Sequence, residues 1–196
     1  MAATLPVTGD PEADQLLEDD PLALILGMML DQQVPMEWAF MGPASLRTRL
    51  GDLDAARIAA MDPDELVAVF CAKPALHRYP AVMARRTLDL CTCIVERYDG
   101  KAELLWEGVD TGAELYGRLG ELPGYGQEKA QIFVAILAKR RGVLPAGWEA
   151  AAGPFADPVP RSVADIDSPE SLARVRDWKK AQKAARKDKQ DRPLKP

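Results

Sequence analysis

Two glycines, Gly124 and Gly126, mark the stretch of this sequence with the most obvious capacity for chemistry. They stand in Leu122-Pro123-Gly124-Tyr125-Gly126, between two segments with the apolar spacing of helices. Glycine tolerates positive φ angles and leaves the backbone bare, so N–H groups of this turn can approach a large ligand. The helix that follows adds unpaired N–H groups and the positive end of its dipole. These features favour a phosphate site for nucleic acid, although the same spacing also suits a tight joint between helices.

A second polar group is predicted at the end of an apolar helix near the N-terminus. Residues 22–30 are apolar on nearly every face, which is typical of a buried helix. The amides of Gln32 and Gln33 follow directly, just ahead of Pro35. They have two interpretations, which are a polar helix end and a hydrogen-bonding tip that faces a groove.

Metal and disulfide chemistry are poorly supported by the sequence. The chain has one histidine, His77, so a site built from several histidines cannot form. The three cysteines are Cys71, Cys91 and Cys93, an odd number without the spacing of a zinc or iron–sulfur site. Asp157 lies in a loop rich in Gly, Ala and Pro, where residue type alone favours a turn residue.

The composition describes a globular chain with an uneven charge. Its 196 residues are 47% hydrophobic, which is enough for a core, and it contains no apolar run long enough to span a membrane. The net charge is −5, but ten Lys/Arg against three Asp from Arg174 onward give that end +7 and leave −12 for the rest. An acidic body argues against a nucleic-acid partner, because phosphate contacts normally dominate such affinity.

Helix signals recur along the chain and predict an all-α fold. Asp62-Pro63 is a favourable helix start, and apolar residues recur at spacings of three and four after Pro80. Another helix is expected from Pro35, broken near Gly42-Pro43 because proline interrupts helical hydrogen bonding. No alternating apolar pattern of the kind that strands show lies between turn signals.

Charge and helix signals together divide the chain into three parts. We expect an acidic N-terminal segment (1–19), one helical domain (20–173) that contains the hairpin unit (111–142), and a basic tail (174–196). The tail is nearly free of apolar residues after Trp178, which predicts a solvated helix or a disordered segment. The N-terminal segment has acidic residues and no basic one, unlike a signal peptide, so we expect a cytoplasmic protein.

The order of these features resembles that of the helix-hairpin-helix (HhH-GPD) base-excision repair DNA glycosylases. Residues 122–126 look like the family hairpin, and residues 30–33 look like its Leu-x-x-Gln segment, in which Gln33 is the matching glutamine. Residues 157–164 resemble the segment with the catalytic aspartate, here Asp157. The similarity spans roughly residues 20–168. It implies a two-lobed helical fold with a helix-hairpin-helix and a cleft between the lobes, in the branch without an iron–sulfur cluster.

The resemblance also implies a mechanism. A base must be flipped out of the duplex before it can be cut, and Gln33 would help fill the gap. Asp157 would stabilise the positive charge that develops on the sugar. Glu128 would be a second catalytic carboxylate, or only an acid that favours the first turn of its helix. Glu128 stands where bifunctional members have a lysine, and we do not expect Lys129, one residue on, to reach the same pocket, which predicts a monofunctional enzyme.

The expected partner is duplex DNA with a damaged or mismatched base, bound by a monomer that associates with the nucleoid and not with membranes. We expect no cofactor, apart from a monovalent cation that the hairpin could hold. The predicted DNA-binding residues are Gln33, Leu122, Gly124, Tyr125, Gly126, Lys129, Arg140 and Arg141. The two arginines have a structural alternative, since cations favour a helix C-terminus. Two other functions stay open: a non-catalytic DNA-binding protein that retains the hairpin, and a helical protein-interaction module.

Overall fold

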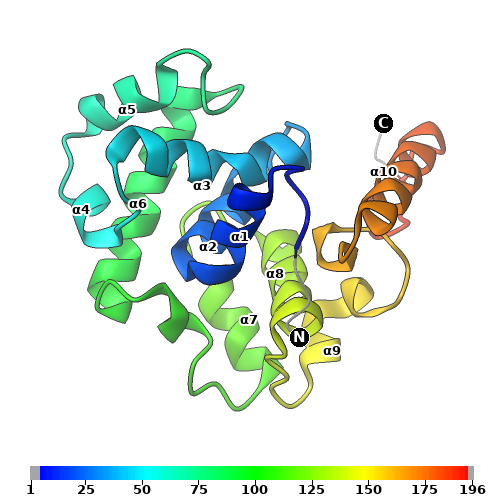
Figure 1. Ribbon diagram of the computed structural model, residues 1–196. Helices are drawn as coiled ribbons and strands as arrows, with labels where there is room; N and C mark the ends of the chain where they lie inside the picture. Colours follow the sequence, from blue (N-terminus) through cyan, green and yellow to red (C-terminus); the bar gives the residue numbers. More distant parts are fainter. Residues whose placement is uncertain (1–4, 194–196) are drawn as a thin grey trace.

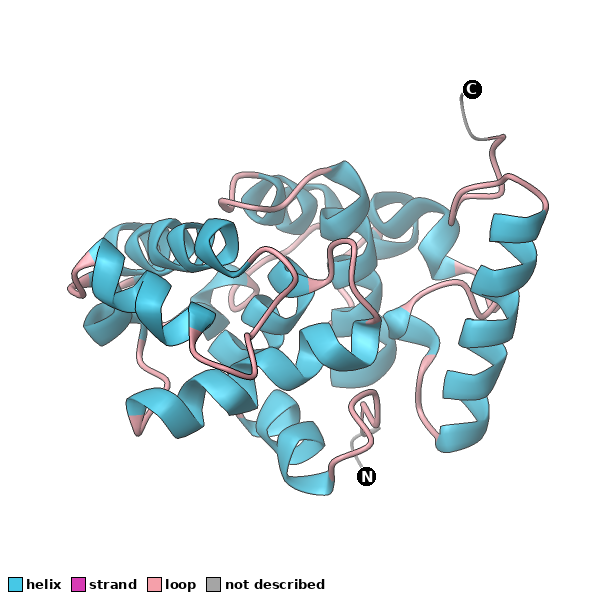
Figure 2. Cartoon of the chain, turned by 90° about the horizontal axis from the view of Figure 1, so that it is seen from above, coloured by secondary structure: helices cyan, strands magenta, loops and turns pink. Residues whose placement is uncertain are grey.

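The computed structural model describes residues 5–193, which form ten α-helices, three short 3-10 helices and no strand (Figures 1 and 2). The all-α prediction is therefore confirmed for this part of the chain. The α-helices are α1 (Pro11–Asp19), α2 (Pro21–Leu30), α3 (Met36–Leu50), α4 (Ala55–Ala59), α5 (Pro63–Cys71), α6 (Pro80–Tyr98), α7 (Gly112–Gly120), α8 (Gln127–Arg141), α9 (Trp148–Ala152) and α10 (Pro169–Ala184). The 3-10 helices are η1 (Ala102–Leu105), η2 (Gly153–Ala156) and η3 (Val163–Asp165).

Four of the helices begin in the same way, with a capping side chain followed by proline. The caps are Asp10, Asp20, Asp62 and Ser168, and each side chain accepts an N–H from the first turn of its helix. The proline at the first helical position already has the helical φ and lacks an N–H that would otherwise be unsatisfied. Local sequence therefore fixes where α1, α2, α5 and α10 start.

The expected break near Gly42-Pro43 is wrong, because α3 continues through both residues. Packing against α2 explains why. A Cβ on Gly42 would lie 2.5 Å from Leu30 Cδ1, and one on Gly27 would lie 2.7 Å from the Phe40 ring, so both glycines allow α2 and α3 to approach closely. The burial of Leu30 and Phe40 that follows offsets the hydrogen bond that Pro43 removes.

The helices form two groups with α2 between them (Figure 1). One group contains α3 to α6, in which α6 packs against α4 and α5. The other contains α7 to α9, which pack against one another, and α10, which reaches them through η3. Helix α2 is buried along nearly its whole length and contacts both α3 and α8. The two-lobed arrangement expected from the sequence is thus present.

Both terminal segments fold onto this body. Leu5, Val7, Leu16 and Leu17 of the acidic N-terminal segment are buried in the core, and α10 continues as a folded turn to residue 193. Residues 1–4 of that segment and 194–196 of the basic tail lie outside the described residues. Within the described range, no helix has the length and apolarity needed to cross a bilayer.

Candidate functional site

The hairpin between α7 and α8 is a tight turn that only glycine can make at one position. The Tyr125 N–H donates to the Leu122 carbonyl at 3.0 Å, which closes the turn. Gly124 has φ +84°, and a Cβ there would lie 2.9 Å from Met29 Cγ, so a side chain is excluded by conformation and by space. Gly126 is extended, with φ −107°, and precedes α8 without a side-chain cap. Gly124 therefore makes the turn, while Gly126 leaves the α8 N-terminus uncovered.

A cavity of about 520 Å³ opens beside this turn, between the two helix groups. Its walls come from the end of α2, from α6, from the hairpin with the first turn of α8, and from the C-terminal segment. The lining residues are Asp31, Gln32, Gln33, Arg86, Gly124, Tyr125, Gly126, Glu128, Lys129 and Lys189. Segments far apart in sequence thus meet here, and the predicted residues Gln33, Glu128 and Lys129 share one space with the hairpin.

The glutamine pair after α2 is held in place by two side chains of α6 and its N-cap. Arg86 Nη1 donates to Gln32 Oε1 at 2.6 Å, and the Tyr79 hydroxyl donates to Gln33 Oε1 at 3.3 Å. Gln33 is exposed and has φ +58°, a left-handed conformation that a glutamine seldom adopts. Its amide therefore lies at the cavity edge, which agrees with the interpretation of this segment as a hydrogen-bonding tip that faces a groove.

Lys129 lies in the cavity wall beside Glu128, so the expectation that it would not reach this pocket is wrong. The Lys129 ammonium donates to the Met29 carbonyl near the end of α2. Helical side chains lean toward the N-terminus, which brings a long lysine back to the hairpin. Burial lowers the pKa of Lys129 to about 8, although the Asp31 carboxylate acts in the opposite direction. The amine is thus mostly protonated at neutral pH.

Glu128 faces the cavity and pairs with the C-terminal segment. Its Oε1 lies 3.3 Å from Lys189 Nζ, and both side chains remain partly exposed. Sequence reasoning missed Lys189, Asp31 and Arg86 as cavity residues. Lys189 is 61 positions from Glu128, and one lysine within a basic tail carries no local signal of such a contact.

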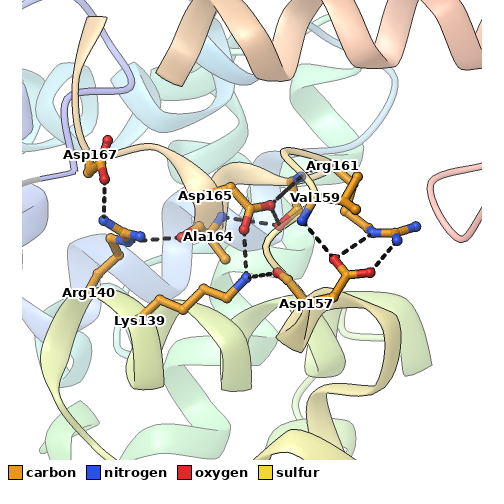
Figure 3. A network of polar contacts seen from close by, with 9 residues as sticks. Lys139, Arg140, Asp157, Val159, Arg161, Ala164, Asp165 and Asp167 are labelled. Carbon is orange, nitrogen blue, oxygen red and sulfur yellow. Dashed lines mark hydrogen bonds and ion pairs between the residues drawn. The ribbon is translucent and has the colours of Figure 1, made fainter. Parts of the chain in front are cut away.

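Asp157 does not line this cavity, and it lies in a separate polar network (Figure 3). Both carboxylate oxygens accept from Arg161, one of them also accepts the Val159 N–H at 3.0 Å, and the Asp157 carbonyl accepts from Lys139 Nζ at 2.7 Å. Lys139 is about 15 Å further along the α8 axis than Lys129, at 1.5 Å per residue. Arg161 also lies over the Trp178 ring, with its guanidinium carbon 5.4 Å from the ring centre.

Arg140 and Arg141 make contacts within the protein. Arg140 Nε donates to the Ala164 carbonyl at 2.9 Å, and the guanidinium lies 3.4 Å from Asp167. Arg141 donates to two backbone carbonyls at the end of α1. Both side chains therefore tie the C-terminal end of α8 to neighbouring segments, which agrees with their structural alternative.

Leu122 and Tyr125, two of the predicted DNA-binding residues of the hairpin, are buried in the protein. The Leu122 side chain is buried, and the Tyr125 ring packs edge-on against Phe133. The Tyr125 hydroxyl donates to the Ile25 carbonyl at 2.9 Å, and burial raises its pKa well above the ordinary value. The Leu122 and Tyr125 N–H groups also donate within the protein, to the Leu119 and Leu122 carbonyls, so neither residue offers a free side chain or N–H group to a ligand.

The described residues contain no group of three or more His, Cys, Asp or Glu side chains able to hold a metal ion. No protein-family model matches the sequence, and no curated protein matches it. Solved structures of similar architecture do exist. Two of them, a trapped covalent endonuclease III–DNA intermediate and a non-covalent endonuclease III–DNA complex, each share 16% identity, with a TM-score of 0.45 over 84% of this chain and 73% of theirs.

A third similar structure is the H. pylori 3-methyladenine DNA glycosylase MagIII bound to 1,N6-ethenoadenine. It shares 14% identity, with a TM-score of 0.49 over 91% of this chain and 97% of that one. At identities this low, the reaction must be argued from the residues of the cavity.

Proposed function

We propose that this protein is a DNA glycosylase of base-excision repair, which hydrolyses the N-glycosidic bond of a damaged or mismatched base. The observation that carries the proposal is the shared cavity, in which the hairpin, the Gln33 amide and the Glu128 carboxylate meet. The hairpin would bind a phosphate, the Gln33 amide would fill the gap in the base stack, and the Glu128 carboxylate would take part in the reaction. The hairpin and the Gln33 segment also carry the resemblance in the sequence, whereas Glu128 stands where bifunctional members have a lysine.

The hairpin would hold a DNA phosphate. Its backbone and the uncapped first turn of α8 supply N–H donors and the positive end of the helix dipole. Lys129 and Arg86 add positive charge to the same wall. The cavity lining has three cations, Arg86, Lys129 and Lys189, against the carboxylates of Asp31 and Glu128, so its local charge is positive although the body is acidic.

The cavity would receive the nucleotide after it leaves the duplex. Base flipping costs a few kcal/mol, and Gln33 at the cavity edge is placed to compensate by bonding within the gap. Glu128 would stabilise the oxocarbenium-like transition state and orient or deprotonate the attacking water. Asp157 is the second candidate for this role, and it could act only after leaving Arg161 and approaching the cavity.

We propose that the enzyme is monofunctional and acts as a monomer without a cofactor. A lyase step needs a neutral amine that attacks the sugar. The Lys129 amine is hydrogen-bonded to the Met29 carbonyl, and this contact opposes its attack on the sugar. Water is the nucleophile that remains.

A non-catalytic DNA-binding protein is the second candidate. One observation favours it: the aspartate that the family pattern assigns to catalysis is held by Arg161 outside the cavity. In that case the hairpin would still bind duplex DNA, but neither carboxylate would release a base.

The test is a panel of duplex oligonucleotides that carry uracil, hypoxanthine, 8-oxoguanine, an alkylated purine or a mismatch. Each is incubated with the wild type, Glu128→Gln and Asp157→Asn, and strand breaks are scored with and without alkali. Alkali-dependent breaks that Glu128→Gln abolishes support the proposal and name the substrate. Loss in Asp157→Asn alone moves the catalytic role to Asp157. Breaks without alkali contradict the monofunctional assignment, and duplex binding without any break favours the non-catalytic candidate.

A further inference from the structure

The C-terminal segment, residues 185–193, is a compact turn that reaches back to the cavity. Asp188 Oδ1 accepts the N–H groups of Gln190 and Arg192 at 2.8 and 2.9 Å, and Lys187 pairs with Asp191 at 3.1 Å. The segment is thus held in shape mainly by its own polar groups. Its four cations and two aspartates make it positive.

This segment is held to the body by few contacts. None of its residues is buried. Apart from bonds to α10, its polar contacts within the described residues are the Lys189–Glu128 ion pair at 3.3 Å and a 3.4 Å hydrogen bond from Arg161 to the Lys189 carbonyl. Partly exposed ion pairs of this kind contribute little to stability and are weakened by salt. The Lys189 ammonium can therefore exchange its partner at low cost.

The position of Lys189 identifies the partner it would take. It lines the same cavity as Gly124, Gly126 and Lys129, which form the proposed phosphate site. A DNA phosphate bound there would place its charge in the space that Lys189 already borders. The phosphate would then compete with the Glu128 carboxylate for one ammonium group.

We propose that Lys189 exchanges partners when DNA binds, from Glu128 in the free protein to a phosphate at the hairpin in the complex. The inference rests on the proposed function of the cavity. The exchange gives Lys189 a direct part in DNA binding. It also releases Glu128 from its ion pair at the moment when the extruded nucleotide needs that carboxylate. Lys189 is thus a positioning residue, and binding of the backbone is coupled to exposure of the reacting group.

A double-mutant cycle on DNA binding tests this exchange. The full chain, Glu128→Gln, Lys189→Met and the double variant are titrated into a fluorescent duplex with a tetrahydrofuran abasic analogue, at several salt concentrations. Lys189→Met should weaken binding about fivefold and reduce the salt slope by about one. Glu128→Gln should tighten binding in the wild-type background, by a factor about three times larger than in the Lys189→Met background. The reason is that only the wild-type background has an ammonium group for this change to release.

Two controls separate this role from a general effect of charge. Lys180→Met removes an exposed lysine of α10 that does not line the cavity, and should change affinity by less than about twofold. Lys189→Arg keeps the charge and should retain the wild-type salt slope. Melting temperatures confirm that each variant is folded.

Each outcome decides between the exchange and its failure. Effects that simply multiply, or an unchanged salt slope in Lys189→Met, overturn the exchange while leaving the glycosylase proposal intact. Absence of duplex binding by the wild type overturns both. A non-multiplicative cycle with the expected sign supports the exchange.

Discussion

The two ends of α8 carry similar charged side chains in different surroundings. At the C-terminal end, Lys139 pairs with Asp165 at 2.6 Å, and the two side chains are only 16% and 8% exposed. At the N-terminal end, Glu128 and Lys129 border an open cavity, and the Glu128 ion pair is partly exposed. At the C-terminal end the charged groups are paired with one another and buried, whereas at the N-terminal end they remain accessible to a ligand. The same residue types thus serve structure at one end and are available for chemistry at the other.

Substitution of each candidate carboxylate by an amide is the strongest test of this difference between the two ends of α8. Glu128→Gln should slow base release by about 10²-fold or more, because a charged group at the transition state is lost. Asp157→Asn should leave the single-turnover rate within about threefold and lower stability by ~1–2 kcal/mol, because Arg161 loses its ion pair. Single-turnover assays and urea melts separate the two effects. The reverse pattern would assign catalysis to the Figure 3 network.

Removal of Lys139 tests the structural end of α8. Lys139→Met should destabilise the protein by about 2–4 kcal/mol, since Asp165 is left buried without its partner. Duplex affinity should stay within about twofold, because this network is separate from the cavity. The free energy of unfolding and a DNA titration measure the two quantities. Weaker DNA binding at unchanged stability would make Lys139 a functional residue.

Substitution of Gly124 tests the turn itself. Gly124→Ala forces a side chain into a positive φ and toward Met29, and should cost about 1–3 kcal/mol. It should also weaken duplex binding, because the hairpin N–H groups move. Gly126→Ala, at an extended residue with no neighbour within 4 Å, is the matched control and should cost less. Equal losses in both variants would contradict the distinct role of Gly124.

The smallest effect concerns the pH dependence of stability. The pKa of Lys129 is about 8 in the folded protein and near 10.5 when unfolded, so the folded state binds fewer protons between these values. The burial penalty is full below about pH 8 and fades as the pH rises. Compared with Lys129→Met, the wild type should therefore gain stability from about pH 7.5 to about pH 9.5. Urea denaturation at both pH values measures the difference, and a constant difference would show that Lys129 titrates normally.

Local features of the fold could be predicted from the sequence. The helix start at Asp62-Pro63 and the hairpin at Gly124 depend on neighbouring residues, and they are found as expected. Helix α3 was not predicted correctly, because the continuation through Pro43 depends on Leu30 and Phe40 in the α2–α3 contact. Local pattern cannot show which residue of one helix will face another.

The candidate site was predictable only in part, for the same reason. Gln33, Glu128 and the hairpin lie within recognisable motifs, and the fold brings them to one cavity. The position of Asp157 depends on the path of α9 and η2, and Lys189 arrives from the far end of the chain. The reach of Lys129 depends on the direction in which a helical side chain leans. These are consequences of tertiary packing and of side-chain geometry.

The bonds between the hairpin and α2 have a mechanical consequence. The Tyr125 hydroxyl donates to the Ile25 carbonyl, and the Lys129 ammonium donates to the Met29 carbonyl. The hairpin and α2 are thus connected by two hydrogen bonds. The two contacts are four residues apart, one turn of α2, and they prevent the turn from sliding along that helix. If the cavity has the proposed function, these contacts fix the distance between the bound phosphate and the Gln33 amide. DNA whose backbone cannot match that span would be rejected before any base is inspected.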